Sequence, residues 1–196
     1  MKTDKRIKNI TSTILSQFWG KLERIDFDFK FKNGSWKRLS HEAYGKSDGV
    51  AILLYNTESK KVVLSKQFRI PVYISGVSEG VSIEVCGGAI DEGESPEACV
   101  LREAKEELGY NVSDLKAINT VFLSPGIVRE RVHLFIAKYN DSDKVDNGGG
   151  LEIEGEEIEV LELSFKDALK MVDTNKIIDA RSIMLLQYAK IHKLLD

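Results

Sequence analysis

Seven residues in one short run of the chain keep spacings that constrain its fold and chemistry more than any other feature. The run extends from residue 88 to residue 110, with a glycine near each end, four glutamates between them and one arginine. Its fixed positions are Gly88, Glu94, Arg102, Glu103, Glu106, Glu107 and Gly109. Carboxylates placed this close together repel one another, so the run favours a hard divalent cation with oxygen ligands as their partner.

We call the run from residue 88 to residue 110 the acidic box. Its middle predicts a helix. Ser95 can cap the first turn with its hydroxyl, Pro96 suits the first helical position, and Gly109 suits the end. At about 100° per residue, the helix is expected to have a core-facing apolar side and an opposite acidic side. The apolar side comprises Leu101, Ala104 and Leu108, and the acidic side comprises Glu103, Glu106 and Glu107.

With no fixed position missing, the acidic box resembles the box of the Nudix family. In that family the segment forms a loop, a helix and a second loop, and its glutamates bind divalent metal ions. The resemblance implies a bracing role for Glu94 and Arg102, with Mg²⁺ as the expected ion and Mn²⁺ as the second choice. The implied metal ligands are Glu103, Glu106, Glu107 and the carbonyl of Gly87. The alternative is a solvated acidic helix, which needs neither the flanking glycines nor the arginine.

The composition of the chain allows one good core with a smaller appended piece. It has 196 residues, 42% of them hydrophobic, and a net charge of −3, which argues against a nucleic-acid partner. The sequence has no apolar run of about 18 residues and no signal-peptide core at its start, so we expect no membrane partner and a cytoplasmic location. Cys86 and Cys99 are expected to be small buried hydrophobes.

The first 47 residues predict an antiparallel sheet. Apolar and polar residues alternate strictly from Ile25 to Lys32, which is typical of a half-buried strand. Asn33-Gly34 predicts a hairpin turn, and residues 35–44 predict the returning strand. A sheet this small buries little alone, so its aromatic face must pack on its own domain, as the default, or on a second subunit. The predicted division is a sheet region at 1–47 and a catalytic domain at 48–196.

The rest of the chain predicts strands interrupted by one helix and ended by others. The expected strands are residues 50–55, 62–64, 81–85, 121–124, 132–139 and 159–163. The expected helices, besides the one in the acidic box, are residues 165–172, capped by Ser164, and residues 181–195. This order predicts an α/β fold with a mixed sheet flanked by helices, which is the α/β/α sandwich of the Nudix family.

Similarity outside the acidic box covers nearly the whole chain. It is carried by Asp48–Asn56, Lys66–Arg69, Ser124–Gly126, Gly148–Gly150 and Glu156–Val160. Together these segments resemble the GDP-mannose pyrophosphatase branch of the Nudix family, which is close to the ADP-ribose pyrophosphatases and shares their N-terminal sheet and dimeric habit. The resemblance implies a homodimer that hydrolyses a nucleotide sugar, GDP-mannose, to GMP and mannose 1-phosphate. ADP-ribose is the alternative substrate, and a non-catalytic nucleotide-sugar-binding regulator is a remote alternative.

The same resemblance implies substrate contacts by position. Arg69 matches an arginine that contacts phosphate or sugar, and a guanidinium can bind phosphate oxygens in pairs, although a surface arginine at a strand end is the alternative. Trp19 matches an aromatic residue that stacks on the base from the other subunit, and packing of the N-terminal sheet is its alternative. The further implied contacts are Glu42, Gly87, Gly88, Ala89, Glu130 and Arg181, the last in place of a lysine.

An acidic loop follows the three glycines at residues 148–150. Glycines beside carboxylates suit a loop that closes on an active site, whereas the alternative is a solvated acidic loop. The family has a catalytic or metal-binding glutamate in this loop. Glu156 is the best match and Glu154 the second, because the loop is two residues longer than expected for the branch. With Glu107 from the acidic box, these are the candidate catalytic residues.

Overall fold

The computed structural model describes residues 5–196, apart from the side chain of Glu154, and separates them into two compact units. The first unit contains the chain through Ser47 together with residues 122–131, and the second contains residues 48–121 and 132–196. The first unit is therefore not one continuous stretch of sequence. The division into domains at residue 47 stays a prediction.

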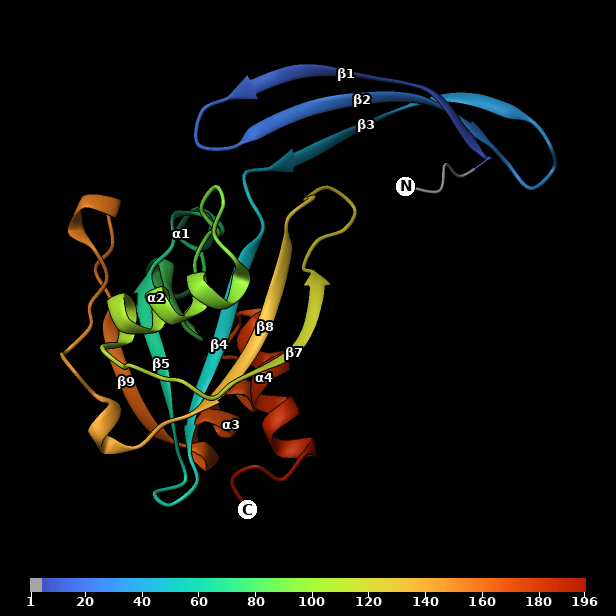
Figure 1. Ribbon diagram of the computed structural model, residues 1–196. Helices are drawn as coiled ribbons and strands as arrows, with labels where there is room; N and C mark the ends of the chain where they lie inside the picture. The colour runs from blue at the N-terminus through green and yellow to red at the C-terminus, as the bar shows by residue number, and fades with distance from the viewer. Residues whose placement is uncertain (1–4) are drawn as a thin grey trace. The chain divides into compact units, whose positions relative to one another are not determined.

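The first unit is built on a three-stranded antiparallel sheet in the order β1-β2-β3 (Figure 1). The strands are β1 Ile7–Gln17, β2 Lys21–Lys30 and β3 Trp36–Gly45. The predicted sheet and its hairpin turn at Asn33-Gly34 are confirmed, with Gly34 at a φ of 84°. β1 has no counterpart among the individual strands predicted, because its isoleucines do not alternate with polar residues and its pairing with β2 contains two register shifts.

The loop at residues 122–131 is tied to this sheet. The amide of Tyr44 donates to the carbonyl of Ile127 at 2.8 Å, and the amide of Arg129 donates to the carbonyl of Tyr44 at 2.9 Å. The guanidinium of Arg129 also lies 2.8 Å from the carboxylate of Glu23, which is only 5% exposed. These contacts explain why the loop groups with the N-terminal strands although it lies between β7 and β8 in sequence.

The second unit contains a six-stranded sheet in the order β6-β5-β4-β8-β7, with β9 also paired to β5. β4 and β8 run parallel, whereas β5 pairs antiparallel with β4, β6 and β9. The predicted mixed sheet is therefore confirmed. β7 begins earlier than predicted and ends before Ser124. The strands are β4 Gly49–Asn56, β5 Lys61–Phe68, β6 Val81–Glu84, β7 Leu115–Phe122, β8 Arg131–Lys138 and β9 Glu159–Ser164.

Helices and short turns complete the second unit. Ser164 caps its helix as predicted, since its hydroxyl accepts from the amide of Asp167 at 3.1 Å. The predicted last helix ends at Ile191 instead of residue 195, and a five-residue helix that follows β5 was not predicted. No helix in residues 5–196 is long and apolar enough to cross a membrane. The helices are α1 Ile70–Ile74, α2 Pro96–Leu108, α3 Phe165–Asp173 and α4 Ala180–Ile191, with 3₁₀ turns at Ser78–Gly80, Asp141–Asp143 and Glu152–Glu154.

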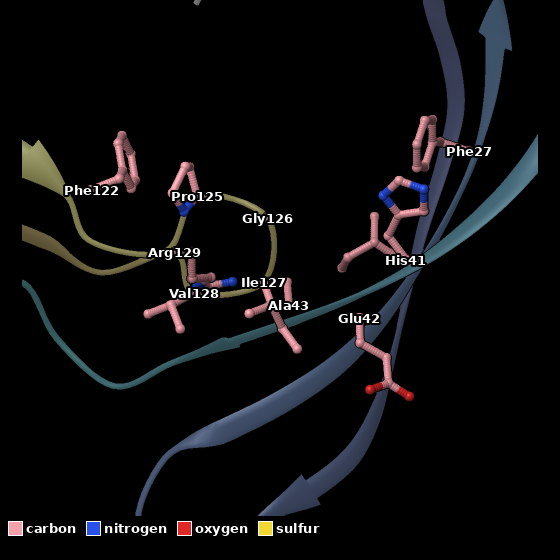
Figure 2. Close-up of a pocket in the computed structure, with 11 residues that line it drawn as sticks. Phe27, His41, Glu42, Ala43, Phe122, Pro125, Gly126, Ile127, Val128 and Arg129 are labelled. Atoms are coloured by element: carbon pink, nitrogen blue, oxygen red, sulfur yellow. The ribbon is translucent and has the colours of Figure 1, made fainter.

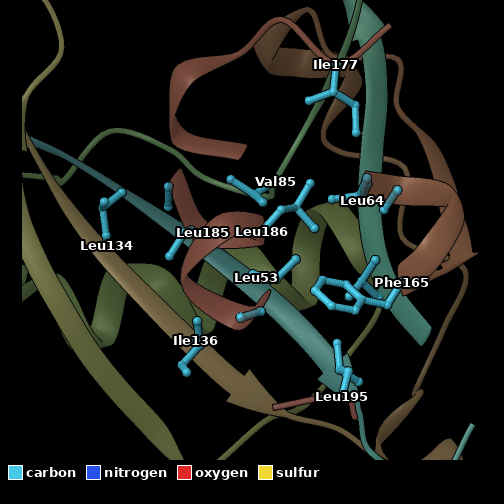
Figure 3. Close-up of a cluster of buried hydrophobic side chains, with 14 of the residues drawn as sticks. Leu53, Leu64, Val85, Leu134, Ile136, Phe165, Ile177, Leu185, Leu186 and Leu195 are labelled. Atoms are coloured by element: carbon cyan, nitrogen blue, oxygen red, sulfur yellow. The ribbon is translucent and has the colours of Figure 1, made fainter. Parts of the chain in front are cut away.

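Two apolar cores cover opposite faces of this sheet, because successive residues of β4 point to alternate sides. Ala51 and Leu53 pack in the core that also contains Leu185 of α4 (Figure 3). Val50 and Ile52 pack in the other core, which contains buried residues of α2, including Cys99. The predicted α/β/α sandwich is confirmed. Cys86 and Cys99 are free and buried in the second core, as expected.

The predicted faces of the helix in the acidic box are partly wrong. Leu101 is 36% exposed, and the core side is instead formed by Cys99, Val100, Ala104 and Leu108. Glu103 is 8% exposed and Glu107 only 1%, so two of the three glutamates are buried, although the prediction put all three on the side opposite the core. The helix is rotated relative to the prediction. As a result, these two carboxylates lie against the loop that contains Gly87 and Gly88, which we call the glycine loop.

Candidate active site

The ends of α2 are fixed by the residues that the sequence indicated. The hydroxyl of Ser95 accepts from the amide of Ala98 at 3.1 Å, and Pro96 occupies the first turn. Gly109 ends the helix with a φ of 79°, a left-handed conformation that suits glycine. Because both ends are capped, the side chains along α2 project from a rigid segment.

Arg102 connects three glutamates of the acidic box. Its Nε donates to Oε1 of Glu94 at 3.1 Å and its Nη2 donates to Oε2 of the same residue at 3.2 Å. Its Nη1 donates to Glu103 at 2.8 Å and to Glu106 at 2.9 Å. The hydrogen bonds that Arg102 donates to Glu94 are the main reason that the pKa of Arg102 is raised. The pair of Glu94 and Arg102 thus has the contacts that a brace for the acidic box requires.

Glu107 and Glu103 form a buried pair of like charges. Burial raises the pKa of Glu107 to about 8, and the nearby charges of Glu103 and Glu156 add to the rise despite a hydrogen bond from Cys86. Burial also raises the pKa of Glu103 to about 6, although Arg102 opposes the rise. These carboxylates are held in a place where ionisation is costly unless a cation is added.

The glycine loop before the box lies against these two carboxylates. The amide of Gly87 donates to Oε2 of Glu107 at 3.2 Å, and the carbonyls of Cys86 and Gly88 accept from the amides of Ile52 and Val50. The role of the Gly87 carbonyl as a metal ligand stays a prediction. A Cβ on Gly88 would lie 2.0 Å from Oε1 of Glu103, so a side chain at this position would force that carboxylate to shift.

Ala89 continues this loop beside β4. It forms an isolated antiparallel bridge with Gly49, and its carbonyl accepts from the thiol of Cys99 at 3.4 Å. Ala89 directly follows Gly87 and Gly88 in the chain. Its contact with substrate stays a prediction.

The three glycines at residues 148–150 are tied to the C-terminal end of α2. The amide of Gly149 donates to the carbonyl of Glu107 at 2.9 Å, and that of Gly150 donates to the carbonyl of Glu106 at 3.2 Å. A Cβ on Gly148, which has a φ of 63°, would lie 2.3 Å from the carbonyl oxygen of Glu107. This anchoring brings the acidic loop to the end of the helix that bears the buried glutamates.

Glu156 is a loop carboxylate whose charge acts on the buried pair. Its Oε2 accepts from the amide of Leu151 at 3.0 Å, and its charge contributes to the raised pKa values of both Glu103 and Glu107. The side chain of Glu154 lies outside the described residues, so the choice between the two loop glutamates stays a prediction.

These side chains fit a hard divalent cation in their chemistry. Residues 5–196, without the side chain of Glu154, contain no group of three or more His, Cys, Asp and Glu side chains already arranged to hold a metal. The available donors, Glu103, Glu107 and the carbonyl of Gly87, are all oxygens, which Mg²⁺ prefers. A bound cation would also offset the cost of burying two like charges, so the donor set and its electrostatics agree with a metal site.

A second charged cluster in the same unit contains both predicted arginines. Arg69 donates from Nε and Nη2 to the two oxygens of Glu84, at 3.1 and 2.9 Å. Arg181 donates from Nη2 to Oε2 of Glu84 at 2.6 Å and from Nε to Asp179 at 2.9 Å. Burial by itself would raise the pKa of Glu84, but the hydrogen bond from Arg69 and the charges of both arginines lower it to about 2.

Three predicted substrate contacts belong to the first unit. Trp19 follows β1 and is 69% exposed, with Nζ of Lys46 at 5.1 Å from its ring centroid. Glu42 lies on β3 and lines a cavity of about 410 Å³ together with residues 125–129 (Figure 2). Glu130 directly follows that segment. The roles of these three residues stay predictions, and the exposure of Trp19 leaves its ring available for stacking.

The fold and the acidic helix define the class of the protein. A family model described as the NUDIX domain matches residues 45–185, and the chain belongs to the Nudix family. A second model, described as the GDP-mannose pyrophosphatase NudK N-terminal domain, matches residues 6–44.

Curated relatives share most of the chain. A protein of Yersinia pestis (strain Pestoides F) is 44% identical over 187 residues, covering 95% of this chain and 93% of the relative. A protein of Yersinia enterocolitica is 43% identical, and the match covers 97% of this chain and 98% of the relative. A protein of Salmonella typhimurium is also 43% identical, and the match covers 95% of this chain and 96% of the relative. All three relatives are named GDP-mannose pyrophosphatase.

Sequence reasoning missed Glu84, the residue that joins Arg69 to Arg181. Its partner Arg181 lies 97 residues away in sequence, and no local spacing connects them. One signal was present, because Glu84 is an acidic residue within the apolar run from Val81 to Val85. A carboxylate in a buried strand indicates a buried cationic partner.

Proposed function

We propose that this chain hydrolyses the diphosphate of GDP-mannose to GMP and mannose 1-phosphate in a reaction that requires a divalent metal ion, Mg²⁺ or in its place Mn²⁺. The observation that carries the proposal is the buried pair of Glu103 and Glu107 against the Gly87 loop, in the same unit as two arginines. The choice of GDP-mannose is supported by the names of relatives that are 43–44% identical.

The metal is assigned to the acidic box and the loop that follows the three glycines. When bound, Mg²⁺ neutralises the charge of the diphosphate and lowers the pKa of water. Glu156, or Glu154 in its place, takes the proton of the water that attacks one phosphorus. Glu107 is central to this set because its carboxylate reaches the glycine loop. The proposed ligands are Gly87, Glu103, Glu106, Glu107 and Glu156.

The substrate is assigned to the arginines and to the glycine loop. Arg69 and Arg181 contact the phosphates or the sugar, since guanidinium groups bind phosphate oxygens with paired hydrogen bonds. Gly87, Gly88 and Ala89 line the diphosphate with backbone atoms. The pair of Glu94 and Arg102, with the Gly109 cap, keeps the acidic box in shape.

The active form is proposed to be a homodimer in which the N-terminal sheet of one subunit serves the other. Residues 1–47 carry 11 Lys and Arg against 5 Asp and Glu, whereas residues 48–196 carry 17 against 26, so the two regions of different subunits attract. Exposed apolar side chains on and after β1, including Ile14 at 52% and Phe18 at 97%, support a covered surface. Trp19 is assigned to stacking on the base, and Glu42 and Glu130 to further substrate contacts.

The cytoplasm is the compartment that we propose for this enzyme. Its two cysteines, Cys86 and Cys99, are both free. Free thiols persist in a reducing compartment, which supports this placement.

A substrate panel tests the proposal. GDP-mannose, GDP-glucose, ADP-ribose and NADH are incubated with the protein and Mg²⁺, and the monophosphate products are converted to phosphate by a phosphatase and counted. The proposal expects GDP-mannose to have the highest kcat/KM. Preference for ADP-ribose would replace the substrate, and binding without turnover of any diphosphate, with Mg²⁺ or Mn²⁺, would contradict an enzymatic function.

A further inference from the structure

Two arginines converge on one buried carboxylate in the second unit. Oε2 of Glu84 accepts from Nη2 of Arg69 at 2.9 Å and from Nη2 of Arg181 at 2.6 Å. Oε1 of Glu84 accepts from Nε of Arg69 at 3.1 Å. Because both guanidinium groups share one oxygen atom, they are held side by side although they come from opposite ends of the unit's sequence.

Glu84 is the charge that makes this arrangement stable. Two guanidinium groups at this separation repel each other, and each is partly removed from water. Glu84 is 4% exposed as a residue, so its charge is poorly screened by solvent. With Asp179, which lies 2.9 Å from Nε of Arg181, the two arginines face two carboxylates, so the cluster has no net charge and offers an anionic group its remaining guanidinium N–H donors.

The two arginines are held to different degrees. Arg181 has a second anchor, since its Nε donates to Asp179 at 2.9 Å. Asp179 in turn caps α4 through the amide of Ser182, whose hydroxyl accepts from the amide of Val85. Arg69, at the N-terminal end of α1, is oriented by its two hydrogen bonds to Glu84, and 38% of its side chain is exposed. Loss of Glu84 therefore releases Arg69 more than Arg181.

Glu84 does not have the contacts of a metal ligand. Both of its oxygens accept from guanidinium groups, whereas Glu107 accepts from the backbone amide of Gly87 and lies beside another carboxylate. The two sites are chemically distinct although the charge of Glu107 acts on Arg69.

We propose that Glu84 is a positioning residue that presents Arg69 and Arg181 as one two-guanidinium grip for the diphosphate of the substrate. This inference rests on the proposed function and adds to it a residue with no substrate contact of its own. Two adjacent guanidinium groups can bind oxygens of neighbouring phosphates at once, which neither arginine achieves alone.

The test is the Glu84→Gln variant, which keeps the shape of the side chain but removes its charge and turns one acceptor into a donor. We expect KM for GDP-mannose to rise about tenfold or more while kcat changes less than about threefold, because a binding interaction is lost and the metal site is intact. The matched control is Glu159→Gln, which removes a carboxylate from an ion pair with Lys66 at 2.6 Å on the same sheet and should leave KM unchanged.

A double variant separates positioning from general damage. If Glu84 acts through Arg69, then Glu84→Gln combined with Arg69→Ala should raise KM scarcely more than Arg69→Ala alone. A Glu84→Gln variant with wild-type KM, or one that only loses folded, active protein without a change in KM, would overturn the inference while the proposed function stands. Failure of the wild-type chain to hydrolyse GDP-mannose would overturn both.

Discussion

Two buried carboxylates in the second unit balance their charge in opposite ways. Glu84 lies between Arg69 and Arg181, and although burial alone would raise its pKa, the arginines lower it to about 2. Glu107 lies beside Glu103, and burial with this like charge raises its pKa to about 8. The first carboxylate is neutralised within the chain, whereas the second needs a proton or a cation. The difference separates a region suited to anions from a region suited to metal ions.

This separation explains how one small site can handle a diphosphate. The arginine cluster offers guanidinium N–H donors before any ligand arrives, whereas the acidic cluster would attract an anion only after a metal ion binds. Under the proposed function, the diphosphate binds to both clusters. The predictions below test each side of this contrast, beginning with the largest expected effect.

The largest effect on kcat is expected from a loop glutamate of the acidic cluster. We expect Glu156→Gln to lower kcat by about 10²–10⁴-fold, the range for loss of a general base, and Glu154→Gln to stay near wild type. The matched pair is measured under the same conditions with Mg²⁺ and GDP-mannose. The reverse result would assign the base to Glu154, and two near-normal variants would remove the loop from the mechanism.

The stability of the metal-free protein should respond to Glu107. A pKa raised from the ordinary 4.5 to about 8 means that the folded state holds a proton more tightly than the unfolded state. The resulting stability is fully present below about pH 4.5 and is lost as the pH rises to about 8, on the order of a few kcal/mol. Urea unfolding at pH 6 and pH 9 measures the loss. Glu107→Gln should flatten this dependence, and a wild-type-like slope in the variant would contradict the assignment.

Glu84 should have the opposite dependence on pH. Its pKa is lowered from 4.5 to about 2, so its contribution is present above about pH 4.5 and is lost as the pH falls toward 2. The expected size is on the order of 3 kcal/mol. Urea unfolding between pH 5 and pH 3 should show a steeper loss for the wild-type chain than for Glu84→Gln. Parallel curves would show that Glu84 has no such linkage.

Trp19 should give the smallest effect, and it concerns the first unit. Loss of base stacking in Trp19→Ala is expected to cost about 1–3 kcal/mol of binding, seen as a higher KM with little change in kcat. Trp36→Ala is the control, because Trp36 lies on β3 and contacts Lys8. A monomer in sedimentation at micromolar concentration would contradict a role across the dimer.

Local signals made much of the fold predictable. Ser95 and Pro96 act at the first turn of α2 and Gly109 acts at its last turn, each on adjacent backbone, so the helix of the acidic box was predicted to its ends. β1 was not predicted as a strand, because its pairing with β2 is irregular and its apolar residues do not alternate. The burial of Glu103 and the exposure of Leu101 could not be predicted either, since they depend on the rotation of α2 against the sheet.

The candidate site was predictable where its residues share a motif. Glu103 and Glu107 lie one turn apart, and their spacing pointed to a metal. Glu84 and Arg181 are 97 residues apart, and only the folded sheet brings α4 beside β6. Their contact depends on packing, which no spacing in the sequence encodes.

The most direct measurement is GMP release from GDP-mannose by the wild-type chain and by Glu107→Gln, each with Mg²⁺ and with EDTA. Our account expects rapid release by the wild-type chain only when Mg²⁺ is present, and loss of most turnover in the variant, with circular dichroism and thermal unfolding confirming that it is folded. Wild-type-like activity in Glu107→Gln, or full activity in EDTA, would contradict a metal-dependent reaction at the acidic box.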